Sequence, residues 1–305
     1  MTSRNDNRPA DPPIAYLERI RSWYLALGYD TPYRWAQFDE VPFTPLRKPL
    51  AEISVGIVTT AAPYQPGRGD QGPGAPYNGA AKFFSVYSGD TAGDPDLRIS
   101  HIAIDRAHTT AEDQGSYFPL EALRKLAAKG IIGSLGPRFH GLPTDRSQRT
   151  MMEVHCPELV ARCMADGVDA VVLAANCPVC HQSVSLAAWA LEEAGIATVV
   201  MGCARDIVEH VGVPRFLFSD FPLGNAAGRP NDPASQIKTA EMAVRLLAEA
   251  TAPRTTIRSP LKWQGAADWK TDYCNAERLS PEELAARRRE FDRGKQEARS
   301  VRKSV

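Results

Sequence analysis

Two cysteines and a histidine lie close together in the run Asn176-Cys177-Pro178-Val179-Cys180-His181. Cysteines separated by two residues at the start of a helix can close a small disulfide ring. Backbone amides at a helix start favour the thiolate over the thiol, and a protonated His181 would strengthen that effect. We therefore expect Cys177 to act as a nucleophile, Cys180 to resolve an intermediate held on it, and His181 to transfer protons.

The same cysteine spacing occurs in zinc knuckles, so the motif has a second interpretation. A structural zinc site uses a second pair of cysteines. The remaining cysteines, Cys156, Cys163, Cys203 and Cys274, form no such pair. A redox or nucleophilic pair is the favoured interpretation, and a zinc site or a chance spacing are the alternatives. The sequence requires no other metal or cofactor.

The elements around the motif indicate an α/β fold. Short apolar runs alternate with helical patterns from residue 131 to 250, which predicts parallel βαβ units with right-handed crossovers. The sequence therefore predicts a doubly wound, mostly parallel sheet in flavodoxin-like lobes, with an N-terminal helix and a charged C-terminal helix or tail. We expect four regions: an N-terminal helical extension (1–50), a first α/β lobe (51–150), a second lobe with the cysteine pair (151–255), and a C-terminal extension (256–305).

Other polar side chains follow the predicted strands 53–59, 131–135, 197–201 and 216–219. Ligands of open α/β sheets bind beyond the carboxyl ends of the strands, so these side chains are candidates for substrate binding. Arginines there could clamp a carboxylate through two hydrogen bonds, and a histidine could shuttle a proton near neutral pH. The candidates are Thr59, Thr60, Ser134, Arg138, His140, Cys203, Asp220, Asn225 and Arg229. Surface ion pairs are the alternative for the arginines, and a buried apolar role is the alternative for Cys203.

Four segments together resemble the selenoprotein B family of the glycine, sarcosine, betaine and D-proline reductases. They are the run NCPVCHQSVSLAAWALEEAGIATV from Asn176, the run FSDFPLGNAAGRPNDP from Phe218, the run IIGSLGPRFHG from Ile131 and the run SHIAID from Ser100. The likeness covers roughly residues 52 to 250.

The resemblance implies a role for the first position of the cysteine pair. In that family this position holds selenocysteine, which attacks a substrate carbon and displaces the amine or opens the ring. Here it is Cys177, and a thiol with a pKa near its usual value of about 8.5 is the weaker nucleophile at neutral pH. The family reductases also depend on a pyruvoyl-bearing partner and on a selenoprotein that takes up the product. The chain departs from the family pattern at Ile102 and Arg106, which puts a transferred role for His101 or Asp105 in doubt.

The sequence thus favours a cysteine-dependent enzyme that acts on a small amino-acid-like or heterocyclic substrate in a reductase-like manner. A second enzyme class is a desulfhydrase, in which Cys177 adds to the C=S carbon of a thiohydantoin-type substrate and sulfide leaves. Cysteines beyond strand ends are also similar to those of the aspartate/glutamate/hydantoin racemase superfamily, which ranks third because its two cysteines come from opposite lobes. A non-enzymatic alternative is a metal- or redox-sensing binding module.

The charge balance argues against two kinds of partner. The formal net charge is +0, so no overall field attracts nucleic acid or an anionic membrane, and a small molecule is the expected ligand. The first residues, Met1 to Pro13, hold no apolar region of a secretory signal, and no run reaches the roughly 18 apolar residues of a spanning helix. We therefore expect a cytoplasmic protein, and the sequence leaves homo-oligomerisation open.

Overall fold

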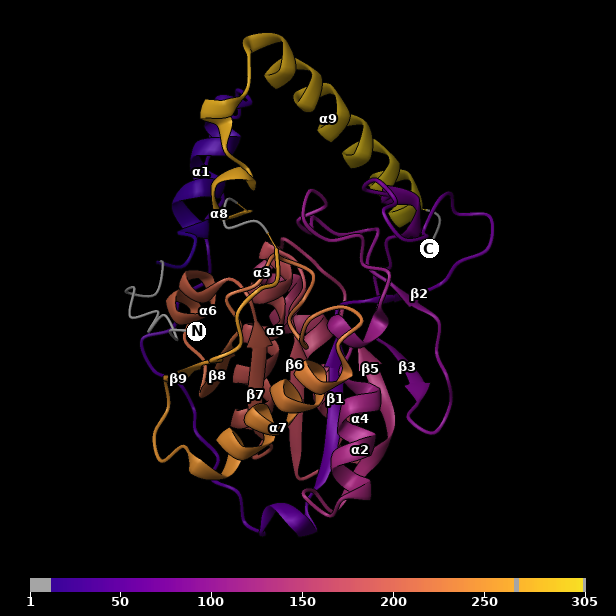
Figure 1. Cartoon of the computed structure of the whole chain (residues 1–305), viewed down its shortest axis with the longest axis vertical. Helices are drawn as coiled ribbons and strands as arrows, with labels where there is room; N and C mark the ends of the chain where they lie inside the picture. Colours follow the sequence, from indigo (N-terminus) through magenta and orange to yellow (C-terminus); the bar gives the residue numbers. More distant parts are fainter. Residues whose placement is uncertain (1–11, 266–268, 304–305) are drawn as a thin grey trace, which may run out of the picture.

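The structure is a computed structural model that describes residues 12–265 and 269–303. Its centre is a seven-stranded sheet in the order β3-β5-β1-β6-β7-β8-β9, and β2 and β4 form a separate two-stranded ladder (Figure 1). The strands are β1 (Ser54–Thr59), β2 (Ala62–Pro63), β3 (Tyr87–Asp90), β4 (Leu97–Arg98), β5 (Ser134–Gly141), β6 (Ala170–Ala174), β7 (Ala197–Gly202), β8 (Arg215–Phe218) and β9 (Thr255–Arg258).

The strand order confirms the predicted doubly wound sheet. All neighbouring pairs of the large sheet are parallel except β3 with β5, which is antiparallel. The order β5-β1-β6-β7-β8 is the 2-1-3-4-5 order of a flavodoxin-like sheet. In this order β5 is added on one side of β1 and the later strands are added on the other, so the switch point lies between β1 and β6. The crevice for a ligand is therefore expected where β1 and β6 end.

Helices cover both faces of this sheet. The connecting helices are α2 (Leu120–Ala128), α3 (Gln148–Thr150), α4 (Cys156–Ala165), α5 (Pro178–Glu193), α6 (Arg205–Val211) and α7 (Pro233–Glu249). On one face α2 packs against α7, and on the other α5 packs against both α4 and α6. A π-helical turn, η4 (Met151–His155), joins α3 to α4 and also contacts α5.

The two predicted lobes share one sheet. β1 and β5, from the first predicted lobe, continue directly into β6 of the second, because β1 pairs with both β5 and β6. The boundary expected after residue 150 therefore separates strands that belong to one hydrogen-bonded sheet. The strand predicted at 131–135 begins later, at Ser134, and extends to Gly141. This shift moves several candidate residues from a loop into a strand.

The termini of the described chain form a cap over the carboxyl ends of the strands (Figure 1). Its helices are α1 (Tyr16–Ala26), α8 (Trp269–Asp272) and α9 (Pro281–Lys303), of which α9 is the predicted charged C-terminal helix. α1 packs on α6, and α9 reaches across to the short turn η2 (Gly79–Ala81). This contact is close, since a Cβ on Gly79 would lie 2.8 Å from the carbonyl oxygen of Gly294. The remaining short turns are η1 (Leu50–Glu52), η3 (Gln114–Ser116) and η5 (Ala276–Arg278).

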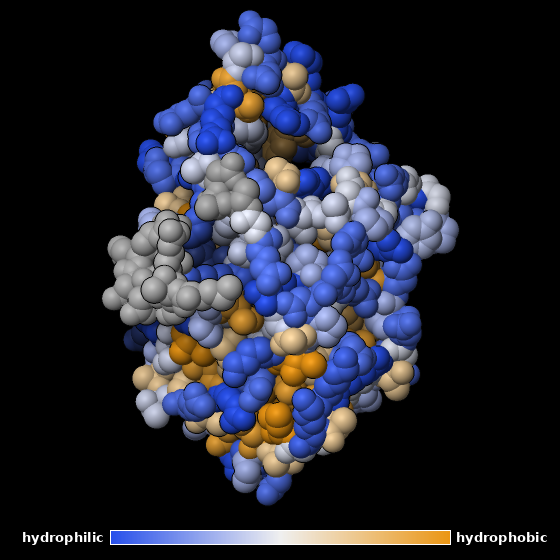
Figure 2. Space-filling view, in the orientation of Figure 1, coloured by the Kyte–Doolittle hydropathy of each residue, from blue (hydrophilic) through white to orange (hydrophobic). Residues whose placement is uncertain are grey.

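The visible surface divides into two regions. Hydrophilic residues dominate the upper part, over α1 and α9, and hydrophobic residues gather lower on this face around α7 (Figure 2). None of the helices within the described residues has an 18-residue stretch apolar enough to cross a bilayer.

Candidate functional site

The cysteine pair lies at the beginning of α5, directly after the central strand β6. Cys177 is the N-cap of α5, and its sulfur accepts a hydrogen bond from the Cys180 amide at 3.2 Å. Pro178 occupies the first turn, where its missing N–H costs nothing. The two sulfurs form a disulfide, with the Cα atoms 4.9 Å apart. The predicted position of the pair at a helix start, within disulfide reach, is confirmed.

The cysteine pair lies beside the topological switch point of the sheet, between β1 and β6. Asn176 follows β6 and Thr60 follows β1, and the Asn176 Nδ2 donates to the Thr60 hydroxyl at 3.4 Å. On the other side, the Thr144 hydroxyl lies 3.5 Å from the Cys180 sulfur. Thr59 ends β1 and its hydroxyl accepts from the Ala61 amide at 3.1 Å. Thr59 and Thr60 are thus at the expected edge, and both are buried.

His181 has a structural position that corrects its predicted proton-transfer role. Its ring is fully buried; Nδ1 donates to the Cys177 carbonyl at 2.7 Å, and Nε2 accepts from the amides of Cys203 and Ala204 at 2.8 and 3.0 Å. Burial lowers the pKa of His181 to about 4, although the bond to Cys177 opposes this shift. A neutral imidazole with both nitrogens occupied joins the loops after β6 and β7, and it supplies no positive charge to the cysteines.

This burial predicts an acid-dependent loss of stability. The folded His181 resists protonation until about pH 4, whereas an unfolded histidine takes up a proton near pH 6.5. The unfolded state therefore binds more protons within this window, so stability is full above pH 6.5 and falls by about 3 kcal/mol as the pH approaches 4. Urea unfolding at several pH values should show a shallower pH slope for His181→Asn than for the wild type. Identical slopes in the two proteins would contradict the assignment.

The candidates on β5 lie within the strand, and two of them bind other protein side chains. Ser134 begins β5 and pairs with Ser54, at the amino end of β1 and thus opposite to the predicted edge. Arg138 donates through Nε and Nη2 to one oxygen of Asp166, at 2.8 and 2.6 Å. His140 is buried between the Ser88 hydroxyl at 2.9 Å and the other Asp166 oxygen at 3.0 Å. All three residues lie within β5, which begins three residues later than the sequence pattern indicated, and not in the loop expected to follow it.

The candidates after β8 lie at the expected edge but bind other protein groups. Asp220 pairs with Arg258 and Lys270, each at 2.6 Å. Asn225 donates to the Pro222 carbonyl at 3.0 Å. Arg229 donates twice to the Asp232 carboxylate, at 2.9 and 2.6 Å. The guanidinium groups of Arg138 and Arg229 are thus each engaged by an aspartate of the protein, which favours the ion-pair alternative for both arginines.

Cys203 belongs to a different apolar cluster from the cysteine pair. It packs with Tyr16, Ile20 and Phe221 beneath α1, whereas Cys177 and Cys180 belong to the main core. Burial raises the pKa of the Cys203 thiol to about 12. The structure thus favours the alternative interpretation of Cys203 as a small buried apolar residue.

Two further polar residues lie near the loops that follow β1 and β6. His101 is buried at 2% exposure beside the Thr60 backbone, and the Asn176 Oδ1 is buried and unpartnered among the described residues. His101 lies in the Ser-His-Ile-Ala-Ile-Asp segment, one of the four segments that resemble the family.

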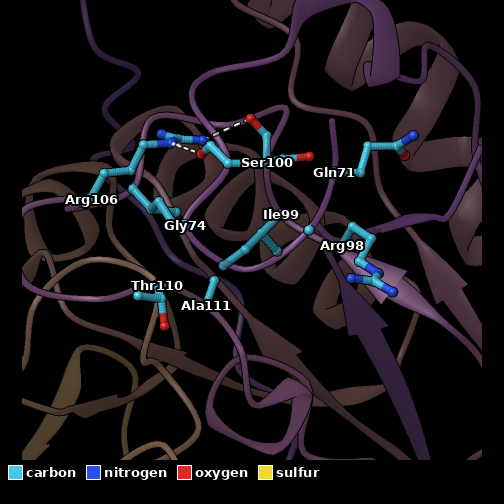
Figure 3. Close-up of a pocket in the computed structure, with 11 residues that line it drawn as sticks. Gln71, Gly74, Arg98, Ile99, Ser100, Arg106, Thr110 and Ala111 are labelled. Carbon is cyan, nitrogen blue, oxygen red and sulfur yellow. Dashed lines mark hydrogen bonds between the residues drawn. The ribbon is translucent and has the colours of Figure 1, made fainter. Parts of the chain in front are cut away.

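A small cleft next to His101 is lined by Arg98, Ser100 and Arg106, among others (Figure 3). Arg106 donates to the carbonyls of Ala75, Ile102 and Ser100 at 2.7 to 2.9 Å. The cleft leaves about 10 Å³ open to water, room for about one water molecule. It therefore packs the loop that carries His101 and is too small for a substrate.

Within the described residues, no group of three or more histidine, cysteine, aspartate or glutamate side chains is arranged to hold a metal ion. No protein-family model and no solved structure matches the chain.

Comparison with curated proteins identifies the family. The gamma subunit of D-proline reductase from Acetoanaerobium sticklandii is 30% identical over 223 residues, which are 72% of this chain and 89% of that subunit. The chain belongs to the selenoprotein B family. The gamma subunit of glycine reductase component B from Peptoclostridium acidaminophilum is 24% identical, and the beta subunit of sarcosine reductase component B from the same organism is 27% identical.

The extent of these matches differs. The similarity covers 72% and 65% of this chain for the glycine and sarcosine reductase subunits, and 50% and 46% of those two relatives. The chain thus spans about half the length of these relatives, but most of the D-proline reductase subunit. Its selenoprotein B relatives are subunits of amino-acid reductase complexes, which supports a role of this chain in reduction.

Proposed function

We propose that the chain is a thiol-dependent reductase subunit that cleaves a carbon–nitrogen bond of a small amino acid or heterocycle. Cys177 is the nucleophile and Cys180 is the resolving thiol. The observation that carries this proposal is the Cys177–Cys180 disulfide at the start of α5, beside the topological switch point between β1 and β6. Ligands of such sheets bind at this place. The names of the relatives support amino-acid reduction as the reaction class.

The proposed reaction uses two electrons, both supplied by the cysteines. The Cys177 thiolate attacks the substrate carbon, and the C–N electron pair leaves on nitrogen, which takes a proton. The Cys180 thiolate then attacks the Cys177 sulfur, so the C–S pair returns to carbon, which also takes a proton. The product contains new C–H and N–H bonds, and the two thiols have become a disulfide. An external dithiol must reduce this disulfide before the next turnover.

The surroundings of the pair suit this sequence of steps. The Cys180 amide already donates to the Cys177 sulfur, and such a bond stabilises a thiolate at that atom. Both cysteines are buried, Cys177 at 3% and Cys180 at 0% exposure, which keeps bulk water away from the pair. We further propose that the chain works with protein partners, because its relatives are named as subunits of complexes.

A single-turnover experiment tests this proposal. The chain, with any subunits that copurify, is reduced with a dithiol, freed of excess reductant and mixed with glycine, sarcosine or D-proline. We expect one reduced product for each new Cys177–Cys180 disulfide, counted by alkylation and mass spectrometry. Product without disulfide, or no reduction of any of the three compounds, would contradict the redox pair.

The same preparation tests the desulfhydrase alternative with a thiohydantoin. Release of sulfide while both thiols stay reduced would favour that alternative. Cys177 adds to the C=S carbon, sulfide leaves, and water then attacks the same carbon and releases the Cys177 thiol, so no electrons are transferred to the substrate.

A further inference from the structure

The two sulfurs of the cysteine pair receive hydrogen bonds from different parts of the chain. The Cys177 sulfur accepts from the Cys180 amide at 3.2 Å, a bond within the first turn of α5. The Cys180 sulfur lies 3.5 Å from the hydroxyl of Thr144, which belongs to the segment after β5. A disulfide sulfur carries no hydrogen, so the threonine is the donor in this contact.

The Thr144 hydroxyl is free to serve the Cys180 sulfur alone. The side chain is buried at 8% exposure, and among residues 12–265 and 269–303 its hydroxyl has no other hydrogen-bond partner. The neighbouring His181 is neutral, with both ring nitrogens bound to backbone groups, so it places no charge beside that sulfur. A hydrogen bond to an ionised group is roughly twice as strong as one between neutral groups. Thr144 is thus placed to stabilise a negative charge on the Cys180 sulfur.

Backbone contacts hold the segment that carries Thr144. The Leu142 amide donates to the Thr59 carbonyl, at the end of β1, at 2.8 Å. On the other side, the Asp145 carboxylate accepts from the Ser147 amide at 2.8 Å and closes a tight turn. Thr144 therefore lies between a bond to the sheet and a closed turn, which limits the directions that its hydroxyl can take.

Two further contacts connect this segment to the helix that carries the cysteines. The Tyr33 hydroxyl donates to the Arg146 carbonyl at 3.0 Å, and the Gln182 side chain donates to the same hydroxyl at 2.5 Å. Gln182 is fully buried on α5, two residues after Cys180. The threonine and the sulfur are therefore held by parts of the chain that are bonded to each other, which keeps the distance between them short.

We propose that the Thr144 hydroxyl stabilises the thiolate of Cys180. This inference rests on the proposed function and adds a residue to its site. When the Cys180 thiolate attacks the Cys177 sulfur, its electron pair forms the S–S bond and the C–S pair returns to the substrate carbon. When an external dithiol attacks the Cys177 sulfur, the S–S pair returns to Cys180, and the second thiol of that reductant then releases Cys177. The threonine proton stays on its oxygen in both directions, so the hydroxyl supplies only the hydrogen bond.

The ultraviolet absorbance of the thiolate tests this inference without any substrate, so that it and the proposed function can fail separately. The full chain with Cys177→Ser is titrated with base, and the titration of the same chain with Cys180→Ser added is subtracted. Only the Cys180 thiolate then contributes to the difference. Thr144→Val, introduced into both proteins, keeps the shape of the side chain and removes the hydroxyl. It should raise the midpoint of the titration by about one pH unit, because a hydrogen bond to a charged group contributes at least that much.

Three further variants separate the hydrogen bond from packing. Thr144→Ser retains the hydroxyl and should keep the midpoint of the parent, whereas Thr144→Ala lacks it and should raise the midpoint as valine does. Thr239→Val is the matched control, because this buried threonine of α7 donates to the Ser235 carbonyl, and it should leave the midpoint unchanged.

An unchanged midpoint in both hydroxyl-free variants of Thr144 would overturn the proposal. Equal upward shifts in Thr144→Ser and Thr144→Val would overturn it as well, since a shift that the hydroxyl does not reverse comes from altered packing.

Discussion

The Cys177→Ser protein should lose turnover by at least about 10³-fold, because a serine hydroxyl is essentially un-ionised at neutral pH and removal of a nucleophile costs that much or more. Serine keeps the N-cap position of α5, since its hydroxyl can accept the Cys180 amide bond that the sulfur accepts now. With both proteins kept in excess dithiol, so that the wild type also lacks the disulfide, the loss should appear in the rate and not in the urea midpoint. Steady-state assays with the best substrate among glycine, sarcosine and D-proline measure it.

Replacement of Cys180 distinguishes the two enzyme classes. In the reductase reaction an adduct on Cys177 must be resolved, so Cys180→Ser should stop the reaction after one bond is broken and leave a substrate-derived mass on Cys177. In a desulfhydrase no disulfide need form, and the effect should be small. Cys274→Ser, at a half-buried free cysteine of the cap, is the control and should retain activity. Full activity of Cys177→Ser would exclude Cys177 as the nucleophile in both enzyme classes.

The largest expected effect on stability comes from the ion pair of Glu192 and Arg215, whose side chains are both fully buried and whose Oε1 and Nη1 lie 2.8 Å apart. Arg215→Met should lower the free energy of unfolding by about 3–5 kcal/mol, because it leaves the Glu192 carboxylate buried without its countercharge. The carboxylate also accepts from the Thr198 amide and from the Thr44 amide, so it joins α5 to β7 and to the N-terminal segment.

Urea unfolding at pH 7 measures this loss. The double variant Glu192→Leu/Arg215→Met should recover part of it, since neither charge then remains unpaired. Arg245→Met is the matched control, because Arg245 forms an exposed pair with Glu241 on α7 and should change stability by at most about 1 kcal/mol. Equal losses for Arg215→Met and Arg245→Met would show that the buried pair contributes no more than an exposed one.

Local sequence determined the centre of the molecule. The apolar run of β6 and the Cys-Pro-x-Cys start of α5 specify a buried strand followed by a helix, because β-branched residues suit the sheet and proline suits the first helical turn. Alternating strands and helices specified the parallel sheet, and the position of the cysteine pair followed from it. These features depend on neighbours within a few residues, so a single sequence contains them.

The partners of the polar side chains were decided only by the tertiary structure. Arg138 was expected in a loop, but the later start of β5 places it in the strand, where it meets Asp166 at the end of α4. His181 looked like a proton donor, yet its ring lies between two loops that satisfy both nitrogens.

The same holds for the surroundings of the cysteine pair. Asn176 binds the Thr60 hydroxyl and the Tyr117 carbonyl, which come from two other segments that only the folded chain brings beside it. Strand and helix formation is governed by local periodicity, whereas the assignment of hydrogen-bond partners depends on segments that only the packed fold brings together.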